Sequence, residues 1–321
     1  MILITGAAGF IGSYLMGYLN KLGEDRILAV DKLGAKEKWK NLLGKKYIDF
    51  VDRDYFIENL GNFNNIKFIF HIGACADTTE LNLDYLMSVN FGYSKKLFKY
   101  AEDKKIPFIY ASSAATYGAG EYGYSDNTEF INKLRPLNPY GFSKQIFDEW
   151  VLRQNDKPPF WAGFKFFNVF GPNEYHKGRM ASVIFHAYNQ LKETKKIRLF
   201  KSHKDGYKDG EQKRDFVYVL DVCKVLTFFY EKQTKSDIYN LGTGTARTFN
   251  DLAESVIKYS GIDGQIEYFD MPEDLRDRYQ YFTEADMDKL KSVGYEKDFS
   301  TLEESIKDYV TNYLMENYKT Y

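Results

Sequence analysis

The segment that decides the fold follows the first apolar run of the chain and reads Thr5-Gly6-Ala7-Ala8-Gly9-Phe10-Ile11-Gly12. The preceding run, Ile2–Thr5, predicts a strand, and apolar residues over 10–22 recur with helical spacing. Between strand and helix, Gly6 permits a tight turn, Gly9 lets backbone N–H groups approach a pyrophosphate, and Gly12 allows close packing of helix on strand. The segment therefore predicts a dinucleotide-binding unit rather than an ordinary tight turn.

The alternation of short apolar runs with longer amphipathic segments continues along the first half of the chain. Further strands are predicted at 27–30, 66–71, 108–112 and 162–167, and helices at 83–102 and 140–153. Later segments predict helices at 181–192, 249–259 and 301–317, a strand at 197–200 and a charged loop at 201–213 that is either mobile or folds over a ligand. This pattern predicts an α/β fold with a Rossmann-type, doubly wound parallel sheet. We expect residues 1–170 to form mainly the NAD(P)-binding domain. Residues 171–321 are expected to form mainly a smaller, interleaved C-terminal substrate-binding lobe, from which about 214–245 return to the first domain.

The composition argues against several classes of partner. The 321 residues include 44 Lys and Arg and 45 Asp and Glu, so no excess of positive charge is available to hold a nucleic acid. No apolar run approaches the roughly 20 residues that a membrane helix needs. The two cysteines, Cys75 and Cys223, lie in apolar segments, which favours a reducing compartment and argues against a metal site. A strand that begins at Ile2 leaves no room for a signal peptide, so we expect a cytoplasmic protein.

Charged residues after the second predicted strand bear on which dinucleotide is bound. Asp31 ends that strand, and a carboxylate at this position hydrogen-bonds the adenine ribose of NAD. Lys32, Lys38 and Arg53 could instead neutralise the 2′-phosphate of NADP, although each taken singly also fits a solvated surface. Asn90, in the middle of a predicted helix, faces either the cofactor or another helix. Another predicted strand is followed by small residues suited to a crossing dinucleotide, Ile72-Gly73-Ala74-Cys75-Ala76.

A second group of residues suggests acid–base chemistry. Tyr140 and Lys144 are four residues apart, so they project from one face of a helix. Ser113 follows a predicted strand at the carboxyl edge, where α/β sheets bind ligands. Positive charge from a lysine and an oxidised nicotinamide lowers the pKa of a tyrosine from about 10 toward neutrality, so that it can act as a general base on a hydroxyl. In a chain with 27 tyrosines a Tyr-x-x-x-Lys pattern can arise by chance. Its combination with the glycine segment and the serine favours chemistry.

Taken together, these motifs resemble the extended short-chain dehydrogenase/reductase family of nucleotide-sugar epimerases and dehydratases. The resemblance covers nearly the whole chain and extends over the segments 166–172, 214–219 and 239–244. Within this family, the chain is most similar to the branch that epimerises an ADP-linked heptose. The residues that carry this similarity are 111–118, His186, Arg278-Tyr279-Gln280 and the string Gly171-Pro172-Asn173-Glu174-Tyr175-His176-Lys177-Gly178-Arg179-Met180-Ala181-Ser182-Val183. Such enzymes invert a carbinol centre, bind NADP tightly and return it unchanged. Homo-oligomers are common among them.

The resemblance implies roles for individual residues. Tyr140 and Lys177 would be the two acid–base groups, Lys144 would anchor the cofactor and Ser113 would hold the substrate. The implied pocket for NADP, with NAD as the alternative, contains Gly6, Gly9, Phe10, Ile11, Gly12, Asp31, Lys32, Lys38, Arg53, Ile72, Gly73, Ala74, Cys75, Ala76, Asn90, Tyr140, Lys144, Val169 and Lys177. The implied ADP-sugar pocket contains Ser113, Asn168, Arg179, His186, Phe200, Arg214 and Tyr279.

Alternatives within and outside this family stay open. A sugar 4,6-dehydratase needs an Asp-Glu pair beside the strand-end hydroxyl, whereas Ser113 is followed by two alanines. A UDP-sugar 4-epimerase keeps the same serine, tyrosine and lysine, and the string around Lys177 argues against it. A non-catalytic dinucleotide-binding protein would be expected to lack Tyr140 or Lys144. His176 and His186 fit a polar surface or a helix cap as well as contact with a substrate.

Sequence positions that depart from the family pattern concern the identity of the nucleotide sugar more than the reaction. Lys32, Arg53 and Arg179 replace an asparagine, a lysine and a serine that are familiar there, and the loop at 201–213 is several residues longer than usual.

Overall fold

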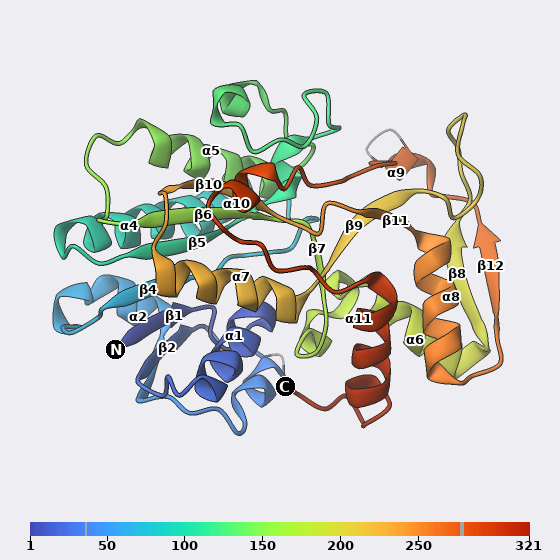
Figure 1. Ribbon diagram of the computed structural model, residues 1–321, viewed down its shortest axis with the longest axis horizontal. Coiled ribbons are helices and arrows are strands. Elements are labelled where there is room, and N and C mark those ends of the chain that lie inside the picture. Colours follow the sequence, from blue (N-terminus) through green and yellow to red (C-terminus); the bar gives the residue numbers. More distant parts are fainter. Residues whose placement is uncertain (36, 277–278) are drawn as a thin grey trace.

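A seven-stranded parallel sheet organises the chain, whose computed structural model describes residues 1–35, 37–276 and 279–321 (Figure 1). The strand order is β10-β6-β5-β4-β1-β2-β3, and every pairing in it is parallel. The strands are β1 (Ile2–Thr5), β2 (Ile27–Asp31), β3 (Asp49–Asp52), β4 (Phe68–His71), β5 (Phe108–Ser113), β6 (Trp161–Phe166) and β10 (Asp237–Leu241). The direction of winding reverses between β1 and β4, which is where doubly wound sheets bind ligands. The predicted fold class is confirmed.

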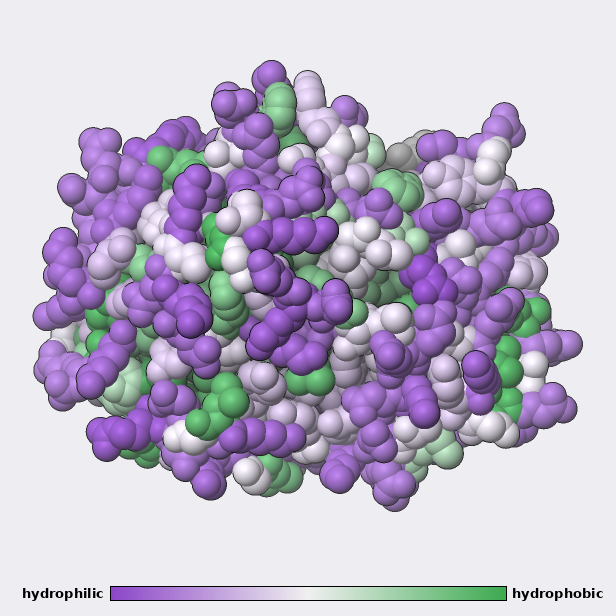
Figure 2. Space-filling model, viewed as in Figure 1, coloured by the Kyte–Doolittle hydropathy of each residue, from purple (hydrophilic) through white to green (hydrophobic). Residues whose placement is uncertain are grey.

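Each face of this sheet has its own apolar core. Ile2 and Ile4 of β1 pack toward α1 (Phe10–Lys21) and α7 (Val219–Lys232), whereas Leu3 packs toward α4 (Tyr93–Asp103) and α5 (Pro139–Arg153). This alternation follows from the period of two along a strand. On the face shown in Figure 2, hydrophilic residues dominate and hydrophobic residues form small, separated patches.

The chain after β6 builds a second group of elements, on the right of Figure 1. A three-stranded sheet contains β7 (Asn168–Phe170), β9 (Lys213–Tyr218) and β11 (Ala246–Thr248), and β8 (Lys196–Phe200) pairs in parallel with β12 (Gln265–Phe269). The accompanying helices are α6 (Val183–Thr194), α8 (Phe249–Ser260), α9 (Glu273–Arg276) and α11 (Leu302–Tyr309), whereas α10 (Asp288–Ser292) packs against β10 of the first sheet. From this part of the sequence, α7 and β10 return to the first sheet, where Asp237 pairs with Ala162.

Two predicted helices contain a change of helical type. The predicted helix 83–102 is α3 (Leu83–Leu86), a π-helical turn (Met87–Gly92) and α4. The predicted helix 301–317 is α11 followed by a π-helical turn (Val310–Leu314). Wide turns of this kind shift the faces of a helix and often occur at functional sites. Several elements were not predicted, among them the short edge strand β3, the sheet strand β10 and the largely apolar helix α7. In a further helix, α2 (Arg53–Glu58), the first residue is one of the predicted cofactor ligands.

Within the described ranges, every helix is too short or too polar to span a lipid bilayer.

Candidate active site

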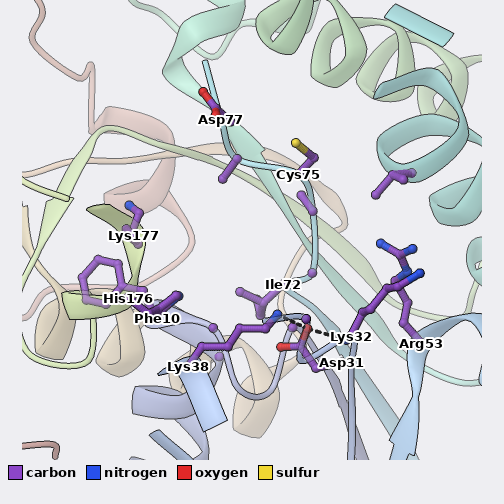
Figure 3. Close-up of a pocket in the computed structure, with 18 of the residues that line it drawn as sticks. Phe10, Asp31, Lys32, Lys38, Arg53, Ile72, Cys75, Asp77, His176 and Lys177 are labelled. Carbon is purple, nitrogen blue, oxygen red and sulfur yellow. Dashed lines mark hydrogen bonds and ion pairs between the residues drawn. The ribbon is translucent and has the colours of Figure 1, made fainter. Parts of the chain in front are cut away.

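A cavity of about 970 Å³ lies at the carboxyl ends of β1, β2 and β4, next to the reversal of strand order (Figure 3). A dinucleotide bound here would cross the sheet as expected for this fold. Of the predicted cofactor residues, those that line the cavity are Gly6, Gly9, Phe10, Ile11, Gly12, Asp31, Lys32, Lys38, Arg53, Ile72, Gly73, Ala74, Cys75, Ala76 and Lys177.

The glycine turn has the geometry that its sequence predicts. Gly6 has a φ of +68°, and a Cβ on it would lie 2.7 Å from the Cα of Gly73. A Cβ on Gly12 would overlap the carbonyl oxygen of Gly6, so α1 can pack this closely only with glycine there. Gly9 is the N-cap of α1 and lines the cavity without a side-chain cap. A helix N-terminus open to the cavity suits an anionic pyrophosphate, so these residues fit a dinucleotide.

The carboxylate of Asp31 is neutralised by its neighbours. Its Oδ2 accepts a hydrogen bond from the Ala8 N–H at 2.9 Å, and its Oδ1 accepts from the Lys32 N–H at 2.7 Å. The Lys38 ammonium forms an ion pair with the same Oδ1 at 2.6 Å (Figure 3). Lys32 and Arg53 lie on the same side of the cavity, and both pair with Asp54. A second anionic group beside Asp31 would therefore meet three cations as well as the carboxylates.

A buried histidine fixes the loop after β4. Ser94 Oγ donates to the Asn90 carbonyl at 2.6 Å, so it accepts the Nε2–H of His71, at 2.8 Å. Nδ1 of His71 then accepts from the Thr5 hydroxyl at 2.7 Å, and Thr5 Oγ1 accepts the Gly73 N–H at 3.1 Å. Burial lowers the pKa of His71 to about 3, with the Lys144 charge acting in the same direction. This neutral relay joins β1, β4 and α4, and no local sequence pattern marks it.

Asn90 faces a loop and a helix rather than the cavity. Its Oδ1 accepts the Cys75 N–H at 2.8 Å, and its Nδ2 donates to the Cys75 carbonyl and to Ser143 Oγ, both at 3.0 Å. Asn90 is buried in the π-helical turn, so it shapes the cavity through the Cys75 loop. Val169, in β7, is likewise outside the cavity lining.

Ser113, Tyr140 and Lys144 meet at the carboxyl end of β5. The side chain of Asn138 accepts the Gly141 N–H at 2.7 Å and starts α5, which carries Tyr140 and Lys144 one turn apart. Burial raises the pKa of the Tyr140 phenol, whereas a hydrogen bond with Ser113 acts in the opposite direction. Lys144 Nζ donates to the Ala111 carbonyl at 3.0 Å. Burial lowers the pKa of Lys144 to about 8. Tyr140 and Lys144 are buried and Ser113 is half-buried, and the three side chains form a candidate acid–base unit at the carboxyl end of β5.

Lys177 approaches the cavity from a different element. It belongs to the 3-10 turn Tyr175–Met180, and its ammonium lies 5.3 Å from the centre of the Phe10 ring (Figure 3). Burial lowers the pKa of Lys177, and the carboxylate of Glu174 opposes that effect. His176 lies beside it and also lines the cavity.

Two buried side chains anchor the turn that carries Lys177. Glu174 accepts from the Ser182 N–H at 2.6 Å, from Ser182 Oγ at 2.7 Å and from the Tyr309 hydroxyl at 3.0 Å. Asn41 Nδ2 donates to the Ala8 carbonyl at 3.0 Å and to the Asn173 carbonyl at 2.9 Å. The lysine turn is thus tied to α6, to α11 and to the glycine turn. Asn41 carries no sequence signal, and Glu174 is marked only by its place in the string around Lys177.

Three of the predicted substrate residues gather in the second group of elements. The ring of Tyr279 lies 5.9 Å from that of Phe200, and the Arg214 guanidinium lies 5.1 Å from the centre of the Tyr279 ring. Burial lowers the pKa of Arg214, while the phenols of Tyr279, Tyr124 and Tyr207 oppose that effect. A buried cation beside aromatic rings can bind the phosphate and the base of a nucleotide.

The other predicted substrate residues lie apart from that cluster. Arg179 lines the cavity at the carboxyl ends of β1, β2 and β4, and it pairs with Asp77 at 3.5 Å. Asn168 is exposed in β7. His186, in the first turn of α6, has a buried Nε2 with no hydrogen-bond partner among residues 1–35, 37–276 and 279–321. Arg278, one of the residues that carried the resemblance, lies outside the described residues.

Known proteins resemble the chain along most of its length. The model of the NAD dependent epimerase/dehydratase family matches residues 2–242, and the chain belongs to this family. A curated protein from Fusobacterium nucleatum named ADP-L-glycero-D-manno-heptose-6-epimerase is 50% identical, with 98% of each chain covered. A protein of the same name from Nitratidesulfovibrio vulgaris is 45% identical, again over 98% of both chains. The family and the branch inferred from the motifs are confirmed.

Solved structures agree with the fold. The crystal structure of ADP-L-glycero-D-manno-heptose-6-epimerase from Helicobacter pylori has a TM-score of 0.82 at 31% identity, covering 97% of this chain and 95% of that one. A UDP-glucose 4-epimerase from Thermotoga maritima has a TM-score of 0.79 at 22% identity, covering 99% of both chains, which shows the fold alone.

Proposed function

We propose that this chain is an NADP-linked nucleotide-sugar epimerase that inverts C6 of an ADP-glycero-manno-heptose by transient oxidation and re-reduction. The heptose epimerases at 45–50% identity support the substrate class. The observation that supports the reaction type is that the two acid–base candidates stand on separate elements. Tyr140 comes from the start of α5, and Lys177 comes from the turn before α6.

Inversion at a carbinol carbon requires that hydride leave from one face of the carbon and return to the other. The bound dinucleotide supplies reversible hydride exchange. Tyr140 takes the proton of the hydroxyl, and Lys144 stabilises the phenolate by its charge. Ser113 donates to the same oxygen and orients it. After the ketone has turned in the site, Lys177 protonates the new alkoxide from the second direction. The lowered pKa of Lys177 suits this transfer near neutral pH.

For the cofactor we assign NADP, with NAD as the alternative. The pairing of Lys38 with Asp31 removes much of the repulsion that a carboxylate would exert on a 2′-phosphate. Lys32 and Arg53 add positive charge on the same side of the cavity. On the substrate side, Arg214 and Tyr279 with Phe200 suit the phosphates and base of the ADP group. Roles for Asn168, Arg179 and His186 stay predictions.

The direct test uses the purified protein without added cofactor. One C6 epimer of ADP-glycero-manno-heptose is incubated with it, and NMR follows formation of the other epimer. UDP-glucose is incubated in parallel. We expect conversion of the heptose only, and no conversion by Tyr140→Phe. Conversion of UDP-glucose to its C4 epimer, with the heptose unchanged, would instead identify a UDP-sugar 4-epimerase.

The proposal also covers the pathway and the cellular compartment of the enzyme. A heptose epimerase would supply a precursor of the lipopolysaccharide core, and the two reduced cysteines favour a cytoplasmic enzyme. A homo-oligomer stays a prediction, which sedimentation of the purified protein tests.

A further inference from the structure

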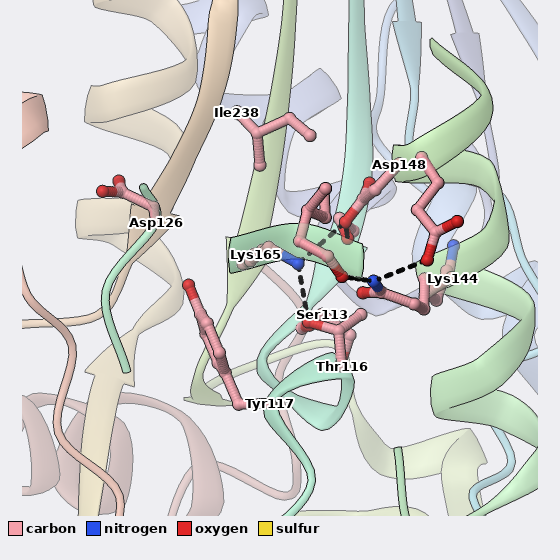
Figure 4. Close-up of polar contacts among 12 residues, drawn as sticks. Ser113, Thr116, Tyr117, Asp126, Lys144, Asp148, Lys165 and Ile238 are labelled. Carbon is pink, nitrogen blue, oxygen red and sulfur yellow. Dashed lines mark hydrogen bonds and ion pairs between the residues drawn. The ribbon is translucent and has the colours of Figure 1, made fainter. Parts of the chain in front are cut away.

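A buried ion pair between Lys165 and Asp148 lies near Ser113 and Lys144 (Figure 4). Lys165 Nζ is 2.9 Å from Asp148 Oδ2, and the two side chains are 2% and 0% exposed. Asp148 belongs to α5, and Lys165 interrupts the otherwise apolar strand β6, which reads WAGFKF. Because the desolvation of two charges offsets most of their attraction, an isolated pair of this kind is a weak source of stability. Its position suggests another use.

The pair holds the strand end that carries Ser113. Asp148 also accepts hydrogen bonds from the Ser112 hydroxyl at 2.7 Å and from the Tyr110 hydroxyl at 3.1 Å. Lys165 Nζ donates to Thr116 Oγ1 at 2.6 Å, and the Thr116 hydroxyl donates to the Ser113 carbonyl at 2.8 Å. Hydrogen bonds therefore fix the chain on both sides of the Ser113 side chain, at Ser112 and at the Ser113 carbonyl.

The position of Asp148 relative to Lys144 is the decisive feature. The two residues are four apart on α5, the spacing at which a carboxylate and a lysine pair on a helix. Lys144 nevertheless donates to the Ala111 carbonyl, at the end of β5. The Asp148 charge raises the pKa of Lys144 against the larger effect of burial, so the two groups interact without pairing. The carboxylate is occupied by Lys165 from the neighbouring strand.

We propose that Lys165 is a positioning residue: by holding Asp148 as its ion-pair partner, it keeps that carboxylate from capturing Lys144 and leaves Lys144 on the Ala111 carbonyl, one helical turn from Tyr140. The ion pair itself is independent of the substrate. The consequence for catalysis rests on the proposed function, in which Tyr140 is the base and Lys144 stabilises its phenolate.

The charges around Tyr140 predict the direction in which its pKa shifts when Lys165 is removed. Ser113 faces the phenol from β5, Cys75 faces it from the loop after β4, and Asp148 acts on it from its own helix. Two lysines interact in turn with Asp148: Lys144, on the same helix, and Lys165, on β6. Lys144, Asp148 and Lys165 together carry one net positive charge. Removal of Lys165 alone cancels that charge and frees Asp148 to draw Lys144 away, whereas neutralising Asp148 and Lys165 together restores it.

The experiment measures ionisation of Tyr140 in the cofactor-loaded protein by NMR of 13Cζ-labelled tyrosine, without any substrate. The Tyr140 resonance is the one missing from Tyr140→Phe. We expect Lys165→Met to raise the pKa of Tyr140 by about half a unit or more. The double variant Asp148→Asn/Lys165→Met and the conservative Lys165→Arg are expected to stay close to the wild type. Asp148→Asn alone is expected to lower this pKa.

A merely structural ion pair would give a different pattern. The inference is wrong if folded Lys165→Met leaves the pKa of Tyr140 unchanged. It is also wrong if the pKa of Tyr140 shifts as far in the double variant as in Lys165→Met. If Lys165→Met does not fold, Asp148→Asn serves as the test instead. The pKa of Tyr140 should then fall, and an unchanged pKa would contradict the inference. In active protein the pH profile of turnover should move with the NMR value. A protein inactive on every nucleotide sugar would refute the proposed function and leave the NMR result intact.

Discussion

The cavity at the glycine turn and the candidate acid–base unit are neighbours that are built in different ways. The cavity is shaped largely by backbone, at Gly6, Gly12 and Gly73, and its charged residues lie at its rim. The acid–base unit is shaped by buried polar side chains from α5, β5 and β6, held by the Asp148–Lys165 pair. Substitutions should therefore act mainly through steric fit in the first region and through charge and proton transfer in the second.

The largest effect is expected from removal of either acid–base group. Tyr140→Phe and Lys177→Met should each reduce epimerisation by about 100- to 10,000-fold, because each removes a positioned proton-transfer group. The cofactor should stay bound in both, as measured by absorbance of the supernatant after denaturation. Lys144→Met should also weaken cofactor binding. Near-normal turnover of Lys177→Met would exclude the two-base scheme and favour a 4-epimerase that uses Tyr140 alone.

A steric substitution tests the backbone-shaped region. In Gly12→Ala the new methyl group meets the Gly6 carbonyl, so we expect loss of about 1–3 kcal/mol of unfolding free energy and little copurifying dinucleotide. Gly61→Ala is the matched control, because a Cβ there meets nothing within 4 Å. Chemical unfolding and cofactor content are the measurements. A Gly12→Ala protein with full cofactor content would show that this close packing is dispensable.

The His71 relay at the rear of the cavity should make stability depend on pH. Burial lowers the pKa of folded His71 to about 3, and the unfolded value is near 6.5. Between these values the unfolded chain binds the extra proton, so unfolding free energy should fall as pH decreases below about 6.5, by roughly 1 kcal/mol per pH unit. Urea unfolding at pH 7 and pH 5 should show that His71→Gln lacks this part of the dependence.

Asp126 provides a control of opposite sign for the His71 measurement. Burial raises the pKa of Asp126 to about 6, so the folded protein binds the extra proton between about pH 4 and 6, and stability from this group increases as pH falls. Asp126→Asn should therefore make the acid sensitivity steeper. If His71→Gln and the wild type have the same dependence, the imidazole is not held neutral by burial.

The contrast between the two regions also explains how much could be predicted from the sequence. The glycine turn and the Tyr140–Lys144 spacing are local patterns, so a single segment carries each of them, and the sheet followed from the repeated strands and helices. His71, Asn41 and Glu174 act through partners that are far away in the chain, and no local spacing marks them. The direction of Asn90 depended on a π-helical turn that periodicity does not reveal.

The smallest effect should come from a charge at the rim of the cavity, where steric fit and charge both act on the cofactor. Lys38 pairs with Asp31, and in the proposed complex it also faces the 2′-phosphate. In Lys38→Ala the phosphate loses a cation and meets a bare carboxylate, so NADP affinity should fall about tenfold relative to NAD, which gains a free acceptor for its ribose hydroxyl. Titration of cofactor-stripped protein with each dinucleotide measures this ratio. Lys40→Ala is the matched control, because Lys40 lies in the same 3-10 turn and pairs with the exposed Glu37 at 2.7 Å. An equal loss of both dinucleotides in Lys38→Ala would mean that this lysine serves the shape of the rim and does not select the cofactor.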